Sequence, residues 1–538
     1  MYFHQSLAQA LRDQGVEDVF GVLGDANLYM FDSFDKLGGR FLSVANEAGG
    51  VLAANGYARI TGGLGVATVT HGPALTNTVT ALVESVKDRT PVLVVAGDTA
   101  VEDRENFQNI SQRDVVLPTG AGFEQVRAPH TVSEDVAVAV RRAHLERRPI
   151  VLNVPIEFQW TEVEHVTSVP RVPARQAVRP DPEAVEEAVG AIASARRPLI
   201  LAGQGAASDG AREALVRLAE RIGAPLATSL RGRDLFRGER FNIGIVGTLS
   251  HSIALDTVAS ADLIVSFGAG LNPWTTAERS VVDSRRIVQV DIDPAALHRF
   301  QRADAAVCGD VGEVADAFVA LLDEAEVPPT SFASEELATR LAEHREDAYK
   351  DLSTEETVDT RTALLRIDRE FPRDRALVID GGRFALSAFR IVHVEHPRNY
   401  IHTVNFGSIG LGMGNAIGVA RGTDKPTLLL AGDGGFMLGG LAEFNTAVRH
   451  GLDIVVFIFN DMAYGAEHIQ FRNKDMDPAL STFDWPDLGP VATALGGQGL
   501  TVRSLDDLDE VFAAIERRDR PILVDIKIDP DRVQLFES

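Results

Sequence analysis

Residues 428–464 read LLLAGDGGFMLGGLAEFNTAVRHGLDIVVFIFNDMAY, and the fold of the whole chain can be inferred outward from them. An apolar run at 427–431 predicts a buried parallel strand. The run breaks at Gly432-Asp433-Gly434-Gly435, a turn that a bulky residue could not follow. An amphipathic helix and a second buried strand at 454–459 come next. Strand, turn, helix and strand form a βαβ unit, in which the strand ends face a ligand.

Two acidic side chains end the strands of this unit. Asp433 follows the first strand and Asp461 the second, so we expect both at one edge of the sheet. The helix N-terminus between them turns backbone N–H groups to the same edge, where they would receive phosphate oxygens. Mg²⁺ binds a few carboxylate oxygens and shares its other positions with phosphate and water. The stretch therefore predicts a site for a diphosphate held through Mg²⁺.

Length and composition place the chain among multidomain globular proteins. Its 538 residues are too many for one core and predict three domains, at 1–166, 183–325 and 358–538. The net charge of −25 argues against nucleic acid or an anionic membrane as a partner. The single cysteine, Cys308, excludes an internal disulfide framework. With neither a signal peptide nor an apolar run that could span a bilayer, we expect a cytoplasmic protein.

Strands and helices alternate along each block, which predicts an α/β fold of three doubly wound parallel sheets. The predicted strands of the first block are 19–22, 41–44, 66–70, 91–96 and 150–154, with helices at 6–14, 48–61 and 76–87. Those of the second block are 198–202, 263–267 and 287–291, and the third block adds 376–379. The proline-rich residues 170–182 predict an extended linker, and the polar residues 324–357 a partly helical connector.

Three motifs in order along the chain carry a family resemblance. Residues 46–98 run from NEAGG through THGPALTN to VVAGD, residues 260–270 read SADLIVSFGAG, and residues 407–420 read GSIGLGMGNAIGVA. Together with the opening stretch, they strongly resemble thiamine diphosphate (ThDP) enzymes of the acetolactate synthase, pyruvate oxidase and 2-oxo acid decarboxylase superfamily. The motifs resemble the pyrimidine-binding, central and diphosphate-binding domains of that superfamily, and the likeness covers almost the whole chain.

The resemblance gives Glu47 a role. By itself, Glu47 would complement the N-terminus of the helix at 48–61. In the family, a glutamate here hydrogen-bonds N1′ of the cofactor's aminopyrimidine, and the cofactor acts as electron sink when a small 2-oxo acid loses CO₂. The diphosphate of that cofactor is held by the other subunit. The resemblance therefore implies a homodimer with active sites at its interface, with tetramers left open.

On the diphosphate side, the resemblance implies that Asp433, Asp461 and the carbonyl of Ala463 hold Mg²⁺. The family's second ligand is the second residue of an Asn-Asn pair, so Asp461 departs from the pattern, and Asn460 is the weaker candidate. Ile409 matches the large apolar residue that props the cofactor in a bent shape. The predicted cofactor-binding residues are Glu47, Gly381, Gly382, Ser408, Ile409, Gly432, Asp433, Gly434, Gly435, Asp461, Ala463, Tyr464 and Gly465.

Departures from the pattern bear on the substrate and point two ways. Gly24-Asp25-Ala26-Asn27 resembles the GDxN turn of 2-oxo acid decarboxylases, and Glu467 falls where those enzymes have an active-site glutamate. Phe107-Gln108 instead resembles the Phe-Gln of acetolactate synthases. His71 and His468 could each shuttle a proton near neutral pH, and a structural role is equally open for either one. The predicted catalytic residues are Glu47, Asp25, His71, Gln108, Glu467 and His468.

We therefore expect Mg²⁺- and ThDP-dependent decarboxylation of a 2-oxo acid with ligation to a second carbonyl, as in acetolactate synthases. A decarboxylase that does not ligate is the alternative. A dinucleotide-dependent oxidoreductase is less favoured, since no full GxGxxG with a following acidic residue comes after a strand. Acetolactate synthases also keep a flavin near an arginine of the middle domain. Residues 267–270 lack that arginine and Gly203-Gln204-Gly205 has low specificity, so FAD stays open.

Overall fold

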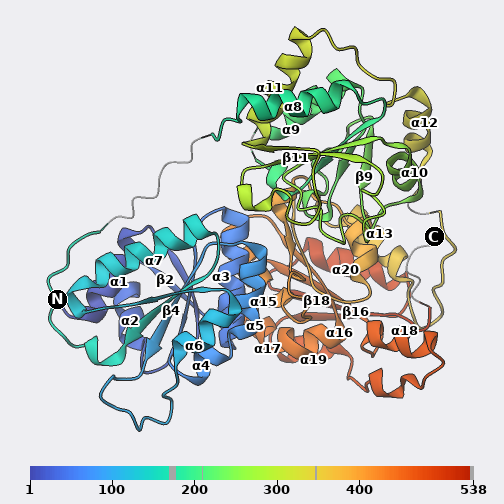
Figure 1. Cartoon of the computed structure of the whole chain (residues 1–538). Coiled ribbons are helices and arrows are strands. Elements are labelled where there is room, and N and C mark those ends of the chain that lie inside the picture. Colours follow the sequence, from blue (N-terminus) through green and yellow to red (C-terminus); the bar gives the residue numbers. More distant parts are fainter. Residues whose placement is uncertain (169–176, 209, 346–347, 533–538) are drawn as a thin grey trace. The chain divides into compact units, whose positions relative to one another are not determined.

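The protein contains three six-stranded sheets, and every strand pairing recorded in them is parallel (Figure 1). The computed structural model describes residues 1–168, 177–208, 210–345 and 348–532. The strand orders are β2-β1-β3-β4-β6-β5 in the first sheet, β12-β11-β10-β7-β8-β9 in the second and β14-β13-β15-β16-β18-β17 in the third. The first and third sheets therefore have the same topology. The predicted α/β class with three parallel sheets is confirmed.

The first sheet is covered by helices on both faces. Its strands are β1 (Asp18–Gly21), β2 (Arg40–Ser43), β3 (Gly65–Val69), β4 (Val92–Asp98), β5 (Gly122–Gln125) and β6 (Ile150–Pro155). Its helices are α1 (Phe3–Asp13), α2 (Leu28–Lys36), α3 (Glu47–Thr61), α4 (Pro73–Thr76), α5 (Val79–Asp88), α6 (Gln112–Val116) and α7 (Val132–Glu146). Helices α1, α2 and α7 bury one face of the sheet, and α3 and α5 bury the other.

The second sheet follows the same alternation of strands and helices. Its strands are β7 (Pro198–Ala202), β8 (Leu226–Thr228), β9 (Asn242–Ile245), β10 (Leu263–Phe267), β11 (Arg286–Asp291) and β12 (Ala305–Cys308). Its helices are α8 (Pro182–Ala193), α9 (Ala211–Ile222), α10 (Ser252–Ser260), α11 (Val311–Glu324) and α12 (Glu335–Glu343). Buried apolar side chains cover the sheet in two clusters.

The third sheet contains the GDGG turn. Its strands are β13 (Ala376–Ile379), β14 (Tyr400–His402), β15 (Thr427–Gly432), β16 (Ile454–Asn460), β17 (Gln498–Val502) and β18 (Ile522–Lys527). Its helices are α13 (Thr360–Glu370), α14 (Ala385–Ile391), α15 (Gly412–Gly422), α16 (Asp433–Gly435), α17 (Leu441–Arg449), α18 (Gly465–Asn473), α19 (Leu488–Ala494) and α20 (Asp507–Glu516). A π-helix, η8 (Phe436–Gly440), joins α16 to α17, so the predicted helix starts at Asp433.

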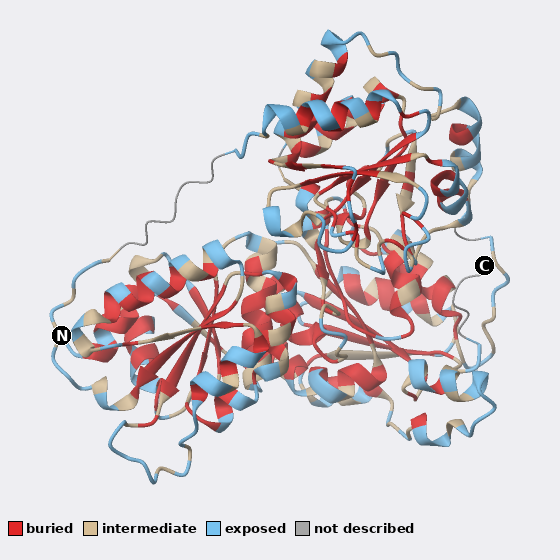
Figure 2. Cartoon of the chain, in the orientation of Figure 1, coloured by how far each residue is buried: buried red, intermediate tan, exposed pale blue. Residues whose placement is uncertain are grey.

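The first and third sheets belong to one compact unit, and the second sheet, together with Phe389–Tyr400, forms another. One hydrophobic core includes residues of both the first and the third sheet and of α3 and α15 between them, and Figure 2 shows the strands buried. Helices α3 and α15 touch through backbone: a Cβ at Gly418 would lie 1.8 Å from the carbonyl oxygen of Ala53. Among the described residues, no helix combines the length and apolar composition needed to cross a membrane.

The predicted strands match the structure to within two residues at either end. The strands that sequence missed are β5, β8, β9, β12, β14, β17 and β18, most of them short or at sheet edges, where polar residues interrupt the apolar pattern. The predicted helix at 76–87 is wrong at its start, because α4 ends at Thr76 and α5 begins at Val79. Helix α12 confirms the partly helical connector. The linker predicted at 170–182 lies largely outside the described residues, and Pro182 begins α8.

The contact between α3 and α15 predicts a strict requirement for glycine at position 418. In Gly418→Ala, the added methyl group would meet the Ala53 carbonyl, and the helices would have to separate. We expect the substitution to destabilise the protein by about 1–3 kcal/mol, measured by thermal or urea unfolding. Gly190→Ala in α8 is the matched control, since nothing lies within 4 Å of the position that its added Cβ would occupy, and it should be neutral or stabilising. Equal stability of the two variants would contradict the packing argument.

Candidate functional site

The carboxyl ends of β13, β15 and β16 bring most of the predicted cofactor-binding residues to one edge of the third sheet. Gly432 pairs with Phe459 and Ile379 with Leu430, so Gly381, Asp433 and Asp461 follow adjacent strand ends. Gly432 has an extended backbone and caps α16, whose first residue is Asp433. This is the edge at which doubly wound sheets bind ligands.

Asp433 and Asp461 form a buried pair of carboxyl groups. They are 2% and 8% exposed, and their side chains share a hydrogen bond. Burial, together with the neighbouring Asp461, raises the pKa of Asp433 to about 8, and burial raises the pKa of Asp461 to about 6 although Arg383 lies nearby. The indole Nε1 of Trp485 donates to Asp433 Oδ2 at 2.9 Å. Two carboxylates held together away from water fit a cation as the missing partner.

The hydrogen bonds of the turn after β16 show which candidate metal ligands are already engaged by other groups. Met462 has a left-handed backbone, with φ of 53°, which is unusual for a residue with a side chain. The Asn460 side chain donates to Asp525 Oδ1 and accepts from the Met462 N–H, so both its ends are occupied. Asp461 Oδ2 lies against Gly465, and the Ala463 carbonyl oxygen lies beside Gly434. This arrangement favours Asp461 over Asn460.

The donor set at this turn fits Mg²⁺. Two carboxylates and a backbone carbonyl from Asp433, Asp461 and Ala463 are hard oxygen ligands that leave positions for phosphate and water. Among the described residues, no cluster of three or more His, Cys, Asp or Glu side chains forms a metal site, so an ion here would depend on the carbonyl and on a bound ligand. Gly434 also lies under the Tyr464 ring, where a Cβ would come within 2.7 Å.

Asp380 holds the loop before α15 against this edge. Its carboxyl group is buried and accepts hydrogen bonds from the N–H groups of Gly381, Gly410 and Leu411 at 2.8, 3.0 and 3.3 Å. Burial raises its pKa to about 6. The bonds fix Ile409 between Gly381 and Gly435, where Cβ atoms added to the two glycines would lie 3.2 and 3.4 Å from the Ile409 side chain.

The other predicted cofactor-binding residues of this loop and of the β13 end also lie at the edge. Ser408 immediately precedes Ile409, and its hydroxyl donates to the Ile409 carbonyl. Gly382 has φ of 154° and lies against the Phe384 ring, so it turns the chain where a side chain would be strained.

Sequence reasoning missed Asp380, Arg383 and Trp485. Asp380 directly precedes the Gly381-Gly382 pair, and a carboxylate at the end of an apolar strand was the available signal. Arg383 is buried, and its guanidinium donates to the carbonyl of Pro530. Trp485 follows no motif in sequence, and only the fold brings it to Asp433.

Glu47 lies at the carboxyl edge of the first sheet, as the first residue of α3. The Asn46 side chain caps the helix by accepting from the Ala48 N–H at 2.9 Å. Glu47 is half-buried, and Asn77 Nδ2, from the break between α4 and α5, donates to its Oε2 at 3.0 Å. Within the described part of the chain, no hydrogen bond or ion pair joins Glu47 to the residues around Asp433.

Asp25, His71 and Gln108 come together at the same edge of the first sheet. His71 Nε2 lies 3.7 Å from Asp25 Oδ1, which accepts a hydrogen bond from Thr70 at 3.1 Å. Gly72, with φ of 61°, lies against the carbonyl oxygen of Gln108. His71 is buried, and its Nδ1 has no hydrogen-bond partner among the described residues. A carboxylate and an imidazole, the latter with one buried and unpaired nitrogen, therefore lie side by side at this edge.

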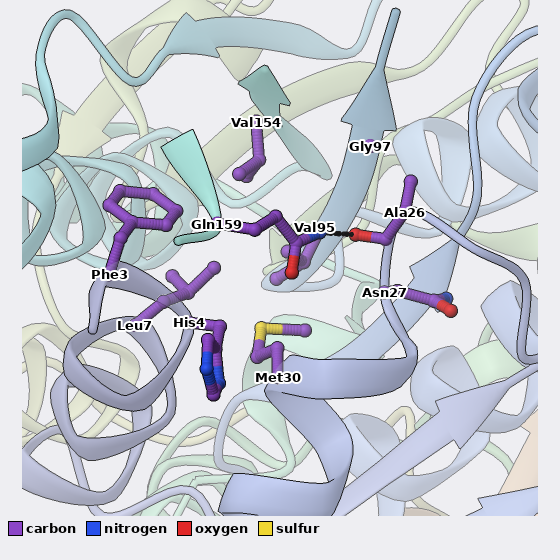
Figure 3. Close-up of a pocket in the computed structure, with 10 residues that line it drawn as sticks. All are labelled: Phe3, His4, Leu7, Ala26, Asn27, Met30, Val95, Gly97, Val154 and Gln159. Carbon is purple, nitrogen blue, oxygen red and sulfur yellow. Dashed lines mark hydrogen bonds between the residues drawn. The ribbon is translucent and has the colours of Figure 1, made fainter. Parts of the chain in front are cut away.

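Hydrogen bonds from Asn27 and Gln159 hold the turn that carries Asp25. Asn27 accepts from the Gly24 N–H at 2.8 Å and donates to the Val22 carbonyl at 3.0 Å. Gln159 donates to the Ala26 carbonyl across a small pocket, and Figure 3 shows this bond beside Asn27. Apolar side chains from α1 and α2 line the same pocket, so the turn rests on the core of the first sheet.

Glu467 and His468 lie on α18, in different surroundings. Glu467 is exposed, whereas His468 is buried. His468 Nε2 lies 2.9 Å from Asp531 Oδ1, and its Nδ1 lies 3.3 Å from the Ser481 hydroxyl. Partners at both nitrogens match a histidine that holds α18 in place.

The glycines of the middle block are used in packing. A Cβ at Gly203 would lie 2.2 Å from the carbonyl oxygen of Gly268, and one at Gly205 would lie 2.8 Å from the Cα of Gly268. Glycine is required because two backbone turns meet, which accounts for Gly203-Gln204-Gly205 without a dinucleotide or a flavin.

Comparison with known proteins shows what the chain is similar to. Residues 1–116 match the model of the thiamine pyrophosphate enzyme N-terminal TPP binding domain, residues 185–318 the central domain, and residues 380–526 the C-terminal TPP binding domain. A probable 2-ketoarginine decarboxylase of Pseudomonas aeruginosa is 29% identical over 94% of this chain and 90% of its own length. An acetolactate synthase large subunit of Parasynechococcus marenigrum is 28% identical over 97% and 87%. A sulfoacetaldehyde acetyltransferase of Castellaniella defragrans is 25% identical over 94% and 88%.

Polar groups at the carboxyl edges of the first and third parallel sheets are typical of ligand-binding α/β proteins. The three matches, in this order along one chain, identify the cofactor as thiamine diphosphate, also called thiamine pyrophosphate. The protein belongs to the thiamine diphosphate-dependent enzymes.

The buried acidic pair predicts opposite effects of one substitution on stability and on binding. Asp433→Asn removes a buried carboxyl group whose raised pKa costs the folded state stability at neutral pH, so the melting temperature in EDTA should rise by about 2–4 °C. The same change should abolish the further rise that Mg²⁺ and ThDP cause, because a bound ligand stabilises the folded state by mass action. Asp484→Asn, at an exposed neighbour of Trp485, is the control and should change neither value. An undiminished response to Mg²⁺ and ThDP would contradict the assignment of Asp433.

Proposed function

We propose that the protein is a Mg²⁺- and ThDP-dependent enzyme that decarboxylates a 2-oxo acid and ligates the remaining fragment to a second carbonyl compound, as acetolactate synthases do. The observation that carries the proposal is the buried pair of Asp433 and Asp461 beside the Ala463 carbonyl. Relatives named acetolactate synthase and sulfoacetaldehyde acetyltransferase support the ligase part of it.

In this proposal, the third sheet holds the diphosphate end of the cofactor. Asp433, Asp461 and the carbonyl of Ala463 would bind Mg²⁺, which in turn would bind the diphosphate. The glycines around the metal ligands let the ligand approach the backbone, and Ile409, fixed by Asp380, would support the cofactor between its two ends. When bound, thiamine diphosphate supplies the electron sink that a 2-oxo acid needs to lose CO₂.

The first sheet supplies the groups that handle protons. Glu47 would hydrogen-bond the cofactor's pyrimidine at N1′, and Asn77 holds its carboxyl group in place. Asp25 and His71 would exchange a proton with the substrate, since an imidazole can donate or accept one near neutral pH. Gln108 lies next to Gly72, within the same loop cluster, as a further polar contact for the substrate.

A second copy of the chain would complete each active site. Among the described residues, Glu47 has no bonded link to the Asp433 cluster, and in the family one cofactor is shared between two subunits. Glu47 of one chain would then serve the diphosphate site of another, which makes a homodimer the minimum active unit. Pairing of dimers into tetramers is compatible with the same arrangement.

A decarboxylase that releases an aldehyde is the second candidate. The Asp25–His71 pair favours it, because such a pair can protonate the fragment left after CO₂ departs. The relative named a probable 2-ketoarginine decarboxylase supports the same alternative. Glu467, which matches the active-site glutamate of such decarboxylases, lies exposed on α18, and from there its side chain would contact the substrate.

The role of Glu47 is tested by Glu47→Gln. The amide cannot act as an acid towards N1′, so turnover of 2-oxo acids with saturating ThDP and Mg²⁺ should fall by about 10²–10⁴-fold. The variant should still gain thermal stability from ThDP, which shows that the diphosphate end is intact. Full activity in this variant would falsify the proposed mechanism.

Product analysis separates the two candidate functions. With pyruvate as the only 2-oxo acid, a carboligase should form acetolactate, and a simple decarboxylase should form acetaldehyde. We expect acetolactate, detected by chromatography alongside CO₂ release. If pyruvate gives no product, a panel of larger and charged 2-oxo acids should be assayed for CO₂. Acetaldehyde without acetolactate would exclude ligation and leave the cofactor assignment intact.

A further inference from the structure

Two buried glutamates, Glu84 and Glu443, are not used by the mechanism above. They are 0% and 2% exposed, and burial raises the pKa of each carboxyl group. Neither one lies at a strand end or among the predicted cofactor-binding residues. A buried carboxyl group costs free energy unless its hydrogen bonds offset the loss of water, so the bonds of both groups call for a structural or functional reason.

Glu443 binds the loop that carries Glu47. It lies on α17, in the third sheet, and its carboxylate accepts from the backbone N–H groups of Ala45 and Asn46 at 3.2 and 3.0 Å. These residues immediately precede Glu47 in the first sheet. Gly49 makes room, because a Cβ there would lie 2.1 Å from Glu443 Oε1.

Glu84 makes the reciprocal contact. It lies on α5, in the first sheet, and accepts from the backbone N–H groups of Asn405 and Phe406 at 3.1 and 2.7 Å, and from Asn405 Nδ2 at 2.7 Å. These two residues lie in the loop between β14 and α15 that leads to Ile409. A helix beside each sheet thus carries a buried carboxylate that binds a loop of the other sheet.

The reciprocity follows from the shared topology of the two sheets. The loops before α3 and α15 occupy equivalent places, after β2 and β14, and α5 and α17 follow the equivalent strands β3 and β15. The helices also carry residues of the candidate site. Asn77, just before α5, donates to Glu47, and Asp433 begins the helical segment that continues into α17.

We propose that Glu443 and Glu84 are positioning residues: Glu443 sets the position of Glu47 towards the pyrimidine of ThDP, and Glu84 sets the position of the loop that carries Ile409. This inference rests on the proposed function. It makes recognition of the pyrimidine depend on a helix that starts at the metal-binding turn. The pyrimidine-binding and diphosphate-binding surfaces of one chain are therefore held together, although in the proposed dimer they serve two different cofactors.

Binding selectivity tests the proposal without using activity. Calorimetry on the full-length protein with Mg²⁺ would give the Kd of ThDP and the Kd of an analogue in which carbon replaces N1′. The wild type should prefer ThDP by about ten-fold or more, since the analogue leaves Glu47 without its hydrogen-bond partner. In Glu443→Ala, the preference should fall to near one-fold, because Glu47 is no longer held in place.

Glu84→Ala is the matched control, since it also removes a buried carboxylate with bonds to backbone. It should weaken both ligands to a similar degree and leave the preference for ThDP intact. Glu443→Gln should keep the preference, because an amide oxygen in the place of Oε1 can still accept from both Ala45 and Asn46. Glu443→Asp should lose it, because the shorter side chain cannot reach, and this variant decides the question if the alanine variant does not fold.

The outcomes separate this inference from the function on which it rests. A wild type that binds neither compound, or both equally, overturns the proposed function or the role of Glu47, and this inference with it. A selective wild type whose Glu443→Ala and Glu443→Asp variants keep the full preference overturns the inference alone. Equal loss of preference in Glu84→Ala and Glu443→Ala also overturns it, because general damage would then explain both.

Discussion

The close crossing of α3 and α15 is the constraint on which the candidate site depends. Gly56 and Gly418 let backbone meet backbone, and Asn55 Nδ2 donates to Asn415 Oδ1 at 3.0 Å inside the contact. Both helices begin at loops that carry candidate cofactor residues. Because the helices cannot slide without a clash, the loops at their N-termini are held in one fixed relation, and Glu443 and Glu84 secure each loop from the opposite sheet.

The site concentrates buried carboxyl groups, and these groups have different tasks. The Asp380 carboxyl group accepts hydrogen bonds from three backbone N–H groups and so holds the loop that carries Ile409. Asp433 and Asp461 instead lie side by side, so ionising both is unfavourable, and their pKa values are raised to about 8 and about 6. A protein stabilised only for folding would not retain such a pair, whereas a cation that joins them turns their repulsion into binding free energy.

Much of the fold could be predicted because buried parallel strands are continuous apolar runs, as at Thr427–Gly432 and Ile454–Asn460. Edge strands such as Tyr400–His402 could not be predicted, since three residues with mixed polarity carry no periodic signal. The metal-binding candidates could be named because they follow the strand ends directly. Trp485 could not, because it comes from a segment with no pattern and reaches Asp433 only through the turn that follows α18.

The sequence by itself determined the three parallel sheets and the residues that follow the strand ends, because glycine turns and apolar runs are local properties. The cofactor class followed from the resemblance of its motifs to a known family. Tertiary structure decided how those residues are supported. Nothing in the sequence around Glu443 indicates that its carboxylate binds Ala45 and Asn46, nearly four hundred residues away. That contact exists only because two sheets of equal topology share one core, which brings each helix to the other sheet's loop.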